Sequence, residues 1–249
     1  MYNYDNMSHA ELIKVIKFLE KVQPVSDSDR KQLEEERRVH MMQQRTNLVR
    51  EVHHRIKNNL QGVAGFLRQH AIQFPEVSAI IDQAISKVRA VAVVHGLQGQ
   101  AFDNEVVLCE MVPTIAQNVG TLLSSHAVLD VCVDVPQRIR VNEQETVPIA
   151  LIFNELIMNA AKHAVAESGI PRIAITVRWD QLQMQAVISI VNPGVLPENF
   201  DFLAGKGIGT GLDLVRSLLP PDGGALSFHT DNGHVKVILA LSVPCIYNI

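Results

Sequence analysis

Apolar side chains recur every three or four positions through the first part of the chain, which is the period of an amphipathic helix. This pattern predicts a short helix over residues 8–22, which Pro24 ends. Ser26 or Ser28 could cap a second helix. Neither Gly nor Pro occurs between Ser28 and Gly62, where Lys, Glu, Arg and Gln dominate. A very long second helix is therefore predicted.

The long helix carries an apolar seam that requires a partner. The seam positions alternate by four and three, as in helical bundles and coiled coils: Met42, Thr46, Val49, His53, Ile56, Leu60, Val63 and Leu67. Pro75 ends the helix, and the apolar run from Val77 to Val94 predicts an antiparallel helix that reaches Gly96. Because one hairpin cannot cover its own apolar stripes, we expect two copies to pack as a four-helix bundle in a homodimer. The alternative is a hairpin that folds onto the rest of its own chain.

After about residue 105 the pattern changes to short helical and strand-like segments that alternate. The predicted helices span residues 112–123, 148–165 and 212–219. The predicted strands span residues 128–135, 172–179, 186–191, 225–230 and 235–241. This alternation predicts an α/β sandwich. The expected fold class is thus α + α/β, with an N-terminal helix and coiled-coil input segment over residues 1–45, a dimerisation hairpin over residues 46–102 and an α/β domain over residues 103–249.

Composition and charge narrow the classes of function. The 249-residue chain is 47% apolar and 19% charged and has a formal net charge of −4, so no basic surface for nucleic acid is expected. Cys109, Cys132 and Cys245 are widely separated and lack the C-x-x-C spacing, which favours reduced thiols over a zinc site or a disulfide framework. No run approaches the ~20 apolar residues of a membrane span, and residues 1–6 lack a signal pattern. We therefore expect a cytoplasmic protein that does not insert into a membrane.

Two adjacent histidines stand in the polar string from Glu51 to Gln61. On a helical wheel with ~100° per residue, His53 falls at the edge of the apolar sector and His54 lies nearly opposite its centre. A histidine that accepts a phosphoryl group must offer a neutral ring nitrogen to a donor held by another domain, so its ring has to project from the bundle. His54 meets this requirement and His53 does not. A lone histidine is more often a packed or surface residue, which is the interpretation kept for His53.

A polar stripe crosses the helix predicted over residues 148–165. Glu155, Asn159, Lys162 and His163 stand at i, i+4, i+7 and i+8 on an otherwise apolar element. Such side chains suit a nucleotide, because an amide oxygen can bind Mg²⁺, a cation can bind phosphate and a carboxylate can order water or polarise the acceptor. The alternative is the solvated face of an amphipathic helix.

Four closely spaced glycines precede the helical pattern that begins at Leu212: Gly205, Gly207, Gly209 and Gly211. Glycines at the start of a helix allow backbone N–H groups to approach phosphates, which the helix N-terminus also attracts. The segment is not a G-x-x-x-x-G-K-S/T phosphate loop, and it does not follow a strand directly as a dinucleotide fingerprint would. On its own, such a turn is weak evidence for a nucleotide site.

The order and spacing of these three clusters resemble a histidine kinase, specifically the HisKA_2 and HWE-like subgroup with a His-Arg-x-Lys-Asn phosphoacceptor box. The resemblance covers residues 45–241 approximately and rests on two strings: His54 to Gln61, and Asn154-Glu155-Leu156 followed by Asn159-Ala160 and Lys162-His163. It implies a dimerisation and phosphotransfer hairpin followed by a GHKL-type (Bergerat) ATP-binding α/β sandwich. It also implies ATP and Mg²⁺ as cofactors and the receiver domain of a response regulator as a partner.

The resemblance assigns roles to individual residues. It implies that His54 is the phosphoacceptor, that Asn159 is the Mg²⁺ ligand and that Glu155 is the catalytic acidic residue beside it. Lys162 is the implied phosphate contact. The implied nucleotide-binding residues are Asn159, Lys162, His163, Asn192, Gly194, Gly207, Gly209, Gly211 and Leu212.

The adenine end of the implied site departs from the family pattern. The family's Asp-x-Gly motif, whose carboxylate accepts a hydrogen bond from the adenine amino group, is here Asn192-Pro193-Gly194. An asparagine oxygen can accept the same bond without charge assistance, which would weaken adenine binding by ~1 kcal/mol. About a dozen residues separate Gly194 from Gly207, so the loop that closes over the nucleotide is short.

The phosphoacceptor box in the hairpin also departs from the family pattern, because an arginine, Arg55, follows His54 where an acid is usual. Either Glu51 or Glu155 could then accept the imidazole proton.

The predicted function is a histidine kinase that autophosphorylates His54 from MgATP and passes the phosphoryl group to an aspartate of a response regulator. The alternative is a phosphotransfer or scaffold protein of the same fold without ATP turnover, which Asn192 and the short loop favour and Glu155, Asn159 and the glycine segment oppose. A GHKL-type protein-serine kinase that inhibits a sigma factor would share the ATP domain but would have no use for a histidine hairpin.

Overall fold

The computed structural model describes residues 10, 13, 14, 17, 27–101, 105–123, 127–165 and 169–248. The helix predicted over residues 8–22 falls mostly outside these residues. The chain divides into two compact units, residues 1–48 and residues 49–249, and each is described by itself. Helix α2 (Asp27–Gln73) spans the boundary, and its described side chains in the first unit are almost all exposed.

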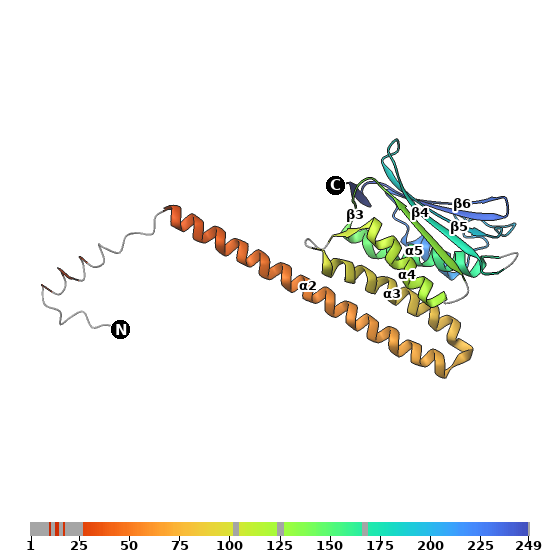
Figure 1. Ribbon diagram of the computed structural model, residues 1–249, viewed down its shortest axis with the longest axis horizontal. Helices are drawn as coiled ribbons and strands as arrows, with labels where there is room; N and C mark the ends of the chain where they lie inside the picture. The colour runs from red at the N-terminus through yellow and green to blue at the C-terminus, as the bar shows by residue number, and fades with distance from the viewer. Residues whose placement is uncertain are drawn as a thin grey trace. The chain divides into compact units, whose positions relative to one another are not determined.

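The predicted hairpin is present in the second unit. Helix α2 stops before the 3-10 turn η2 (Pro75–Val77), because Pro75 supplies no N–H for a helical hydrogen bond. Helix α3 (Ser78–Gln100) then returns antiparallel to α2 (Figure 1). The long helix and its antiparallel mate are thus confirmed.

Part of the apolar surface of α2 remains open within one chain. Val52, Val63 and Phe66 are 47%, 48% and 61% exposed. The side of α2 that faces α3 carries Lys57 and His53, a member of the predicted seam. The hairpin therefore uses one side of α2 for α3 and leaves an apolar side uncovered.

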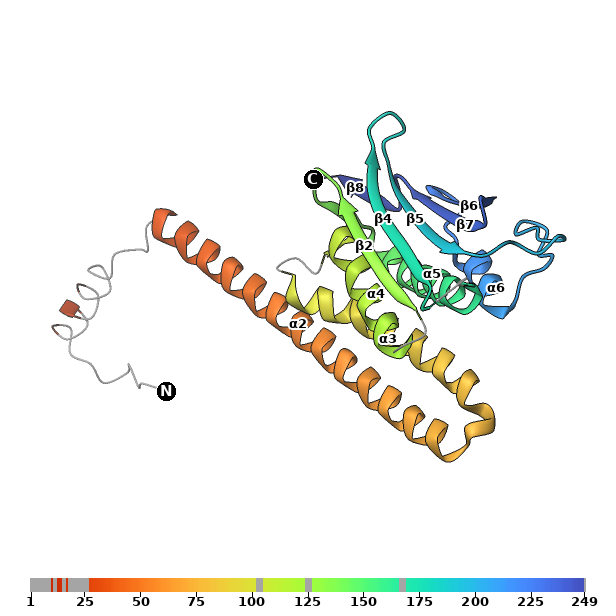
Figure 2. The same ribbon diagram turned by 45° about the vertical axis from the view of Figure 1, so that its right-hand side comes forward.

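The C-terminal half is an α/β sandwich built on a five-stranded sheet (Figures 1 and 2). In spatial order its strands are β2 (Val128–Asp134), β4 (Arg172–Asp180), β5 (Gln185–Pro193), β7 (His234–Leu241) and β6 (Gly224–Asp231). Strands β2 and β4 are parallel, and the other neighbours are antiparallel. A smaller antiparallel sheet joins β1 (Val106–Val107), β3 (Ile139–Val141) and β8 (Ile246–Asn248). The predicted fold class is confirmed.

Three helices cover one face of the large sheet (Figure 2): α4 (Leu108–Leu123), α5 (Glu143–His163) and α6 (Thr210–Leu218). Alternate residues of β4, β5 and β7 are buried, as a sheet with one covered face requires. Helix α3 packs against α4 and α5, and its Val93 and Val94 belong to the same apolar core. The hairpin is therefore attached to the sandwich through α3.

Three helices begin earlier than the sequence pattern predicts, α6 by two residues and α4 and α5 by more. Helix α5 begins at Glu143 because the Asn142 side chain accepts a hydrogen bond from the Gln144 N–H at 3.1 Å and caps the helix; the predicted start, Pro148, lies inside it. Helix α4 begins at Leu108. Strands β1, β3 and β8 were not predicted, because two or three residues are too few to show an alternation.

Candidate functional site

A cavity of about 840 Å³ lies between α5, the start of α6, strands β5 to β7 and one side of α3. It falls within the size range of ligand pockets, roughly 300–1,000 Å³. Residues predicted from the sequence line it: Glu155, Asn159, Lys162, His163, Asn192, Gly207, Gly209, Gly211 and Leu212. The structure therefore brings the polar stripe, the glycine segment and Asn192 to one cavity.

Helix α5 supplies the polar wall of the cavity. Glu155 is only 6% exposed, and the Asn159 Nδ2 is buried without a hydrogen-bond partner among the described residues. Such a donor costs free energy unless a ligand or water supplies an acceptor. The Asn159 amide thus fits a site that an oxygen-rich ligand completes.

The glycine segment meets this wall at Gly211, in the first turn of α6. A Cβ placed on Gly211 would lie 2.5 Å from Glu155 Oε2 and 3.7 Å from Asn159 Nδ2. No larger residue fits there unless the carboxylate moves. Gly207 has a φ of +67°, in the left-handed region that favours glycine. These glycines let the backbone at the N-terminus of α6 approach the acidic and amide groups of α5.

Asn192 and a set of apolar side chains also line the cavity. Asn192 is 3% exposed, and its Nδ2 donates to the Pro193 carbonyl at 3.0 Å, which leaves the amide oxygen as the accepting group. The apolar lining residues come from four elements and suit a flat heterocycle: Met158, Leu212, Phe228, Val235 and Val237.

Gly194 lies beside Asn192 but is not among the residues that line the cavity. Its φ is +146°, and a Cβ there would lie 3.1 Å from the His163 carbonyl oxygen. The close approach of two backbone segments explains why glycine follows Asn192 and Pro193. Burial, with a smaller effect from Lys162, lowers the pKa of His163 and favours its neutral form.

The structure places His54 elsewhere, near the other end of α3. His54 is half-buried, and a Cβ on Gly99 would lie 3.4 Å from its Cε1 and Nε2 atoms. Within one chain the ring lies against α3 and remains partly accessible. The expectation that it projects from the four-helix bundle concerns the dimer and stays a prediction. The helical wheel located the apolar seam. It could not show a second contact side of α2, where Gly99 of α3 leaves room for the His54 ring. His54 is not among the residues that line the nucleotide-sized cavity.

His53 joins α2 to α3 through His95. The two Nδ1 atoms are 3.0 Å apart, so one ring donates and the other accepts, and the ring centroids are 5.3 Å apart. Burial lowers the pKa of both rings, and it is the largest effect on each; Glu143 opposes it at His53. The interpretation of His53 as a packed residue agrees with this geometry.

Two contacts that the sequence did not predict join α3 to α5. The Ser86 hydroxyl donates to Asn154 Oδ1 at 2.7 Å, and Lys87 Nζ lies 3.3 Å from Glu155 Oε1. Asn154 stands in the quoted motif, but no pattern in the sequence shows which residue of the hairpin meets it. Ser86 also lines the cavity, as do the neighbouring α3 residues Asp82 and Gln83.

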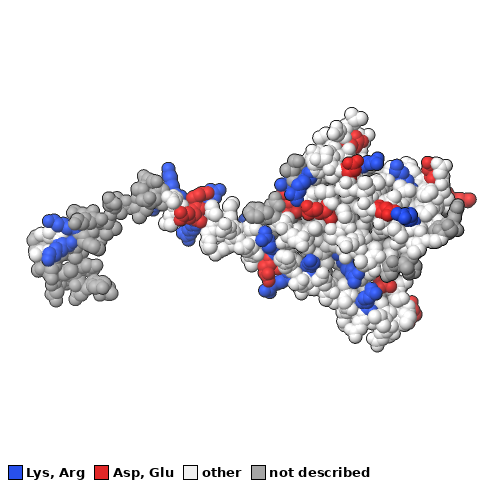
Figure 3. Space-filling model, in the orientation of Figure 1, with Lys and Arg blue, Asp and Glu red and all other residues white. Residues whose placement is uncertain are grey.

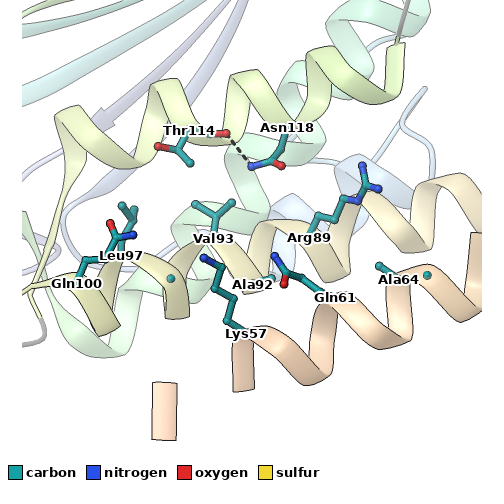
Figure 4. A pocket seen from close by; sticks show the side chains of 12 residues that line it. Lys57, Gln61, Ala64, Arg89, Ala92, Val93, Leu97, Gln100, Thr114 and Asn118 are labelled. Atoms are coloured by element: carbon teal, nitrogen blue, oxygen red, sulfur yellow. Dashed lines mark hydrogen bonds between the residues drawn. The ribbon is translucent and has the colours of Figure 1, made fainter. Parts of the chain in front are cut away.

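A second cavity, of about 600 Å³, lies among α2, α3 and α4 (Figure 4). Small residues on the facing helices leave this space, among them Ala64, Gly96 and Ala92. Lys57 and Arg89 line it, and none of its described lining residues is acidic. On the face of the second unit shown in Figure 3, by contrast, blue and red side chains are interspersed.

Comparison with known proteins identifies the hairpin. Residues 51–123 match the model of HisKA_2, a family described as histidine kinase. This segment therefore resembles the HisKA_2 family, and it contains His54, all of α3 and all of α4.

Curated relatives extend the similarity across the sandwich. The chain is similar to the sensor histidine kinase PdtaS of Mycolicibacterium smegmatis, with 27% identity over 207 residues that cover 78% of this chain and 39% of the relative. It is 26% identical over 181 residues to PdtaS of Mycobacterium tuberculosis, which covers 69% of this chain and 34% of that protein. The chain therefore spans between a third and two fifths of the length of these relatives.

Solved structures show the same fold. The histidine kinase domain of the blue-light activated histidine kinase EL346 from Erythrobacter litoralis superposes with a TM-score of 0.55 at 19% identity, covering 80% of this chain and 93% of that chain. A second structure of the EL346 kinase gives a TM-score of 0.54 at 17% identity, with 76% and 60% covered. Among the described residues, no helix combines the length and apolar character that a bilayer crossing requires.

Proposed function

We propose that this chain is an ATP-dependent histidine kinase that phosphorylates His54 and passes the phosphoryl group to an aspartate on a response regulator. One observation carries the proposal: a single cavity collects Glu155 and Asn159, the glycine segment and Asn192, which come from three separate parts of the sequence. Its polar lining residues suit a polyphosphate and its apolar ones suit a base. The match of the hairpin to a histidine kinase family supports His54 as the acceptor.

The residues present fit a nucleotide and its metal ion. The buried Asn159 Nδ2 lacks a partner in the described part of the chain, and a phosphate oxygen would supply the missing acceptor. The Asn159 amide oxygen is of the hard type that Mg²⁺ prefers, so Asn159 is the residue that would hold the ion. Bound there, Mg²⁺ would neutralise charge on the phosphates. Lys162 and the backbone at Gly207, Gly209 and Gly211 would contact phosphate oxygens, and Asn192 the adenine amino group.

In the proposed reaction a neutral ring nitrogen of His54 attacks the γ-phosphorus. A P–N bond forms while the bond to the bridging oxygen of the departing ADP breaks. Glu155 is the proposed proton acceptor. Glu51 is a weaker base, because the Arg55 Nε donates to its carboxylate at 2.8 Å and lowers its pKa.

Binding of a non-hydrolysable ATP analogue tests the nucleotide site directly. Calorimetry with Mg²⁺ should give a saturable isotherm for the wild-type chain and a weaker one for Asn159→Ala, by about tenfold for the loss of one charge-assisted contact. Absence of binding to the wild type at millimolar analogue would favour the alternative, a phosphotransfer or scaffold protein without ATP turnover.

We propose that the chain is a homodimer assembled through the open side of α2. Val52, Val63 and Phe66 are too exposed for the interior of a hairpin, and a second copy would bury them in a four-helix bundle. Residues 46–102 would form this dimerisation domain and residues 103–249 the catalytic domain. Residues 1–45, which include the first part of α2, would carry the input signal.

Phe66→Glu tests the dimer. A carboxylate in the middle of the apolar side would be desolvated on assembly, so light scattering should show a shift from dimer to monomer at micromolar concentration. Gln69→Glu adds the same charge at an exposed position three residues along the helix and should leave the dimer intact. Equal masses for the two variants and the wild type would exclude this surface as the interface.

A further inference from the structure

The cavity of about 600 Å³ among α2, α3 and α4 is separate from the proposed nucleotide site, and the two have none of their described lining residues in common. Its volume falls in the range of small-molecule sites, roughly 300–1,000 Å³. Ala64 of α2 and Ala92 of α3 are buried in its walls, and larger side chains at these positions would fill it. The cavity is therefore large enough for a ligand of its own.

Two cationic side chains, Lys57 and Arg89, line this cavity. Neither has an ion pair or a hydrogen bond with any other residue that the structure describes. Both are half-buried, so water and salt screen their charges less than at an open surface. Lys57 extends from α2 toward α3 (Figure 4), where a Cβ on Gly96 would lie 3.3 Å from its Cδ. Glycine at this position thus lets the lysine stem lie along α3.

The acidic residues of the three surrounding helices are engaged elsewhere. From residue 49 on, α2, α3 and α4 carry one acidic residue each: Glu51, Asp82 and Glu110. The carboxylate on α2 accepts a hydrogen bond from Arg55 Nε at 2.8 Å, and the one on α4 accepts from Arg138 Nη2 at 3.1 Å. The one on α3 lines the nucleotide-sized cavity. An anion from outside the chain would therefore supply the charge that the two cations lack.

The wall that α4 contributes offers hydrogen-bond acceptors. Asn118 Nδ2 donates to the Thr114 carbonyl oxygen at 3.0 Å (Figure 4), which leaves Asn118 Oδ1 as the accepting group of that amide. The Thr114 hydroxyl donates to the Glu110 carbonyl oxygen at 2.7 Å, so its own oxygen can still accept. Hydroxyl groups of a ligand are the donors that suit both oxygens. The cavity thus combines cations on α2 and α3 with acceptors on α4.

We propose that this cavity binds a small anion that also carries hydroxyl groups, such as a sugar phosphate or a hydroxy acid. Lys57 and Arg89 would bind the phosphate or carboxylate group, to which the guanidinium can donate two parallel hydrogen bonds. Asn118 and Thr114 would accept hydrogen bonds from the hydroxyl groups. Lys57 follows His54 by three residues on α2, so the anion would lie about one helical turn from the proposed phosphoacceptor. This second site does not depend on nucleotide binding at the first.

Calorimetry of the full chain with ribose 5-phosphate and with citrate tests the site and distinguishes phosphate from carboxylate ligands. At least one of the two should give a saturable isotherm with the wild type. Lys57→Gln and Arg89→Gln should each weaken that binding about tenfold, because each loses one charge-assisted contact. Neutral ribose and inorganic phosphate, which lack the anionic group and the hydroxyl-bearing chain respectively, should bind more weakly. Absence of binding of both probes at millimolar concentration would overturn the proposal.

Matched variants separate binding in this cavity from a general effect of charge. Arg55→Gln removes a cation from α2 that is 76% exposed and pairs with Glu51, so it should bind the probe as the wild type does. Ala64→Leu keeps both cations but fills the space between the helices, so it should abolish binding without lowering the melting temperature. Circular dichroism checks the fold of each variant. Equal losses in Arg55→Gln and Lys57→Gln, or full binding in Ala64→Leu, would contradict the site.

The nucleotide-sized cavity also suits phosphate, and a further comparison separates the two sites. Asn159→Ala should weaken binding of the ATP analogue but leave binding of the small anion unchanged, and saturating analogue with Mg²⁺ should not displace the anion. Binding that Asn159→Ala lowers and Lys57→Gln does not would place the anion in the nucleotide cavity and overturn the proposal. A wild type that binds the anion through Lys57 but does not bind the ATP analogue would retain this site and lose the proposed kinase function.

Discussion

Replacement of His54 by Gln is expected to abolish incorporation of the γ-phosphoryl group. Glutamine has no ring nitrogen that can form the P–N bond, whereas its size and polarity fit the half-buried place against Gly99. Incubation with γ-labelled ATP and Mg²⁺ should label the wild-type chain with acid-labile, base-stable phosphate. The variant should show no label above background.

His53→Gln is the matched control for this substitution. It removes the adjacent imidazole and its contact with His95, 3.0 Å between the Nδ1 atoms, and leaves the proposed acceptor in place. We expect this variant to remain labelled, with a rate that reflects any loosening of the hairpin. Label that persists in His54→Gln but disappears in His53→Gln would transfer the acceptor role to His53.

Gly211→Ala is expected to lower the autophosphorylation rate by about a hundredfold, the usual cost of misplacing a catalytic group by roughly 1 Å. The added Cβ would lie 2.5 Å from Glu155 Oε2, so the carboxylate must move out of its position. The atom that moves is the free end of a side chain, so the fold should survive. Steady-state labelling and circular dichroism of the same sample measure the two effects.

Gly209→Ala provides the control two residues earlier. A Cβ at Gly209 meets no atom within 4 Å, and its φ of −96° is accessible to any residue. This variant should keep most of the wild-type rate. Comparable losses in both variants would mean that loop flexibility, and not the position of Glu155, sets the rate.

The parts of the structure that the sequence predicted are those in which one pattern dominates. The period of three and four residues along α2 and α3 and the alternation in β4, β5 and β7 each reflect burial of a single continuous face. The cavity residues were predictable because the spacing of Glu155, Asn159 and Lys162 puts them on one side of α5. Strands β1, β3 and β8 were missed because hydrogen bonding to distant segments, and not local alternation, defines them.

The environment of His54 could not be predicted from its own helix. A helical wheel describes one apolar sector, but α2 has two contact sides, and the second depends on Gly99 of α3. The docking of Lys87 on Glu155 is equally non-local, since it joins residues 68 positions apart. Such pairings depend on how the hairpin meets the sandwich, which neither periodicity nor motif spacing contains.

Asn192 gives the proposed base-recognition end a property that an aspartate there would lack. A carboxylate loses its charge when acid protonates it, whereas the asparagine amide does not ionise and presents the same acceptor at any physiological acidity. Any response of this chain to mild acidification would then arise at imidazole groups: His53 and His95 in the hairpin and His163 in the cavity, whose pKa values burial lowers. Protonation would act on the proposed kinase through these three rings and not through Asn192.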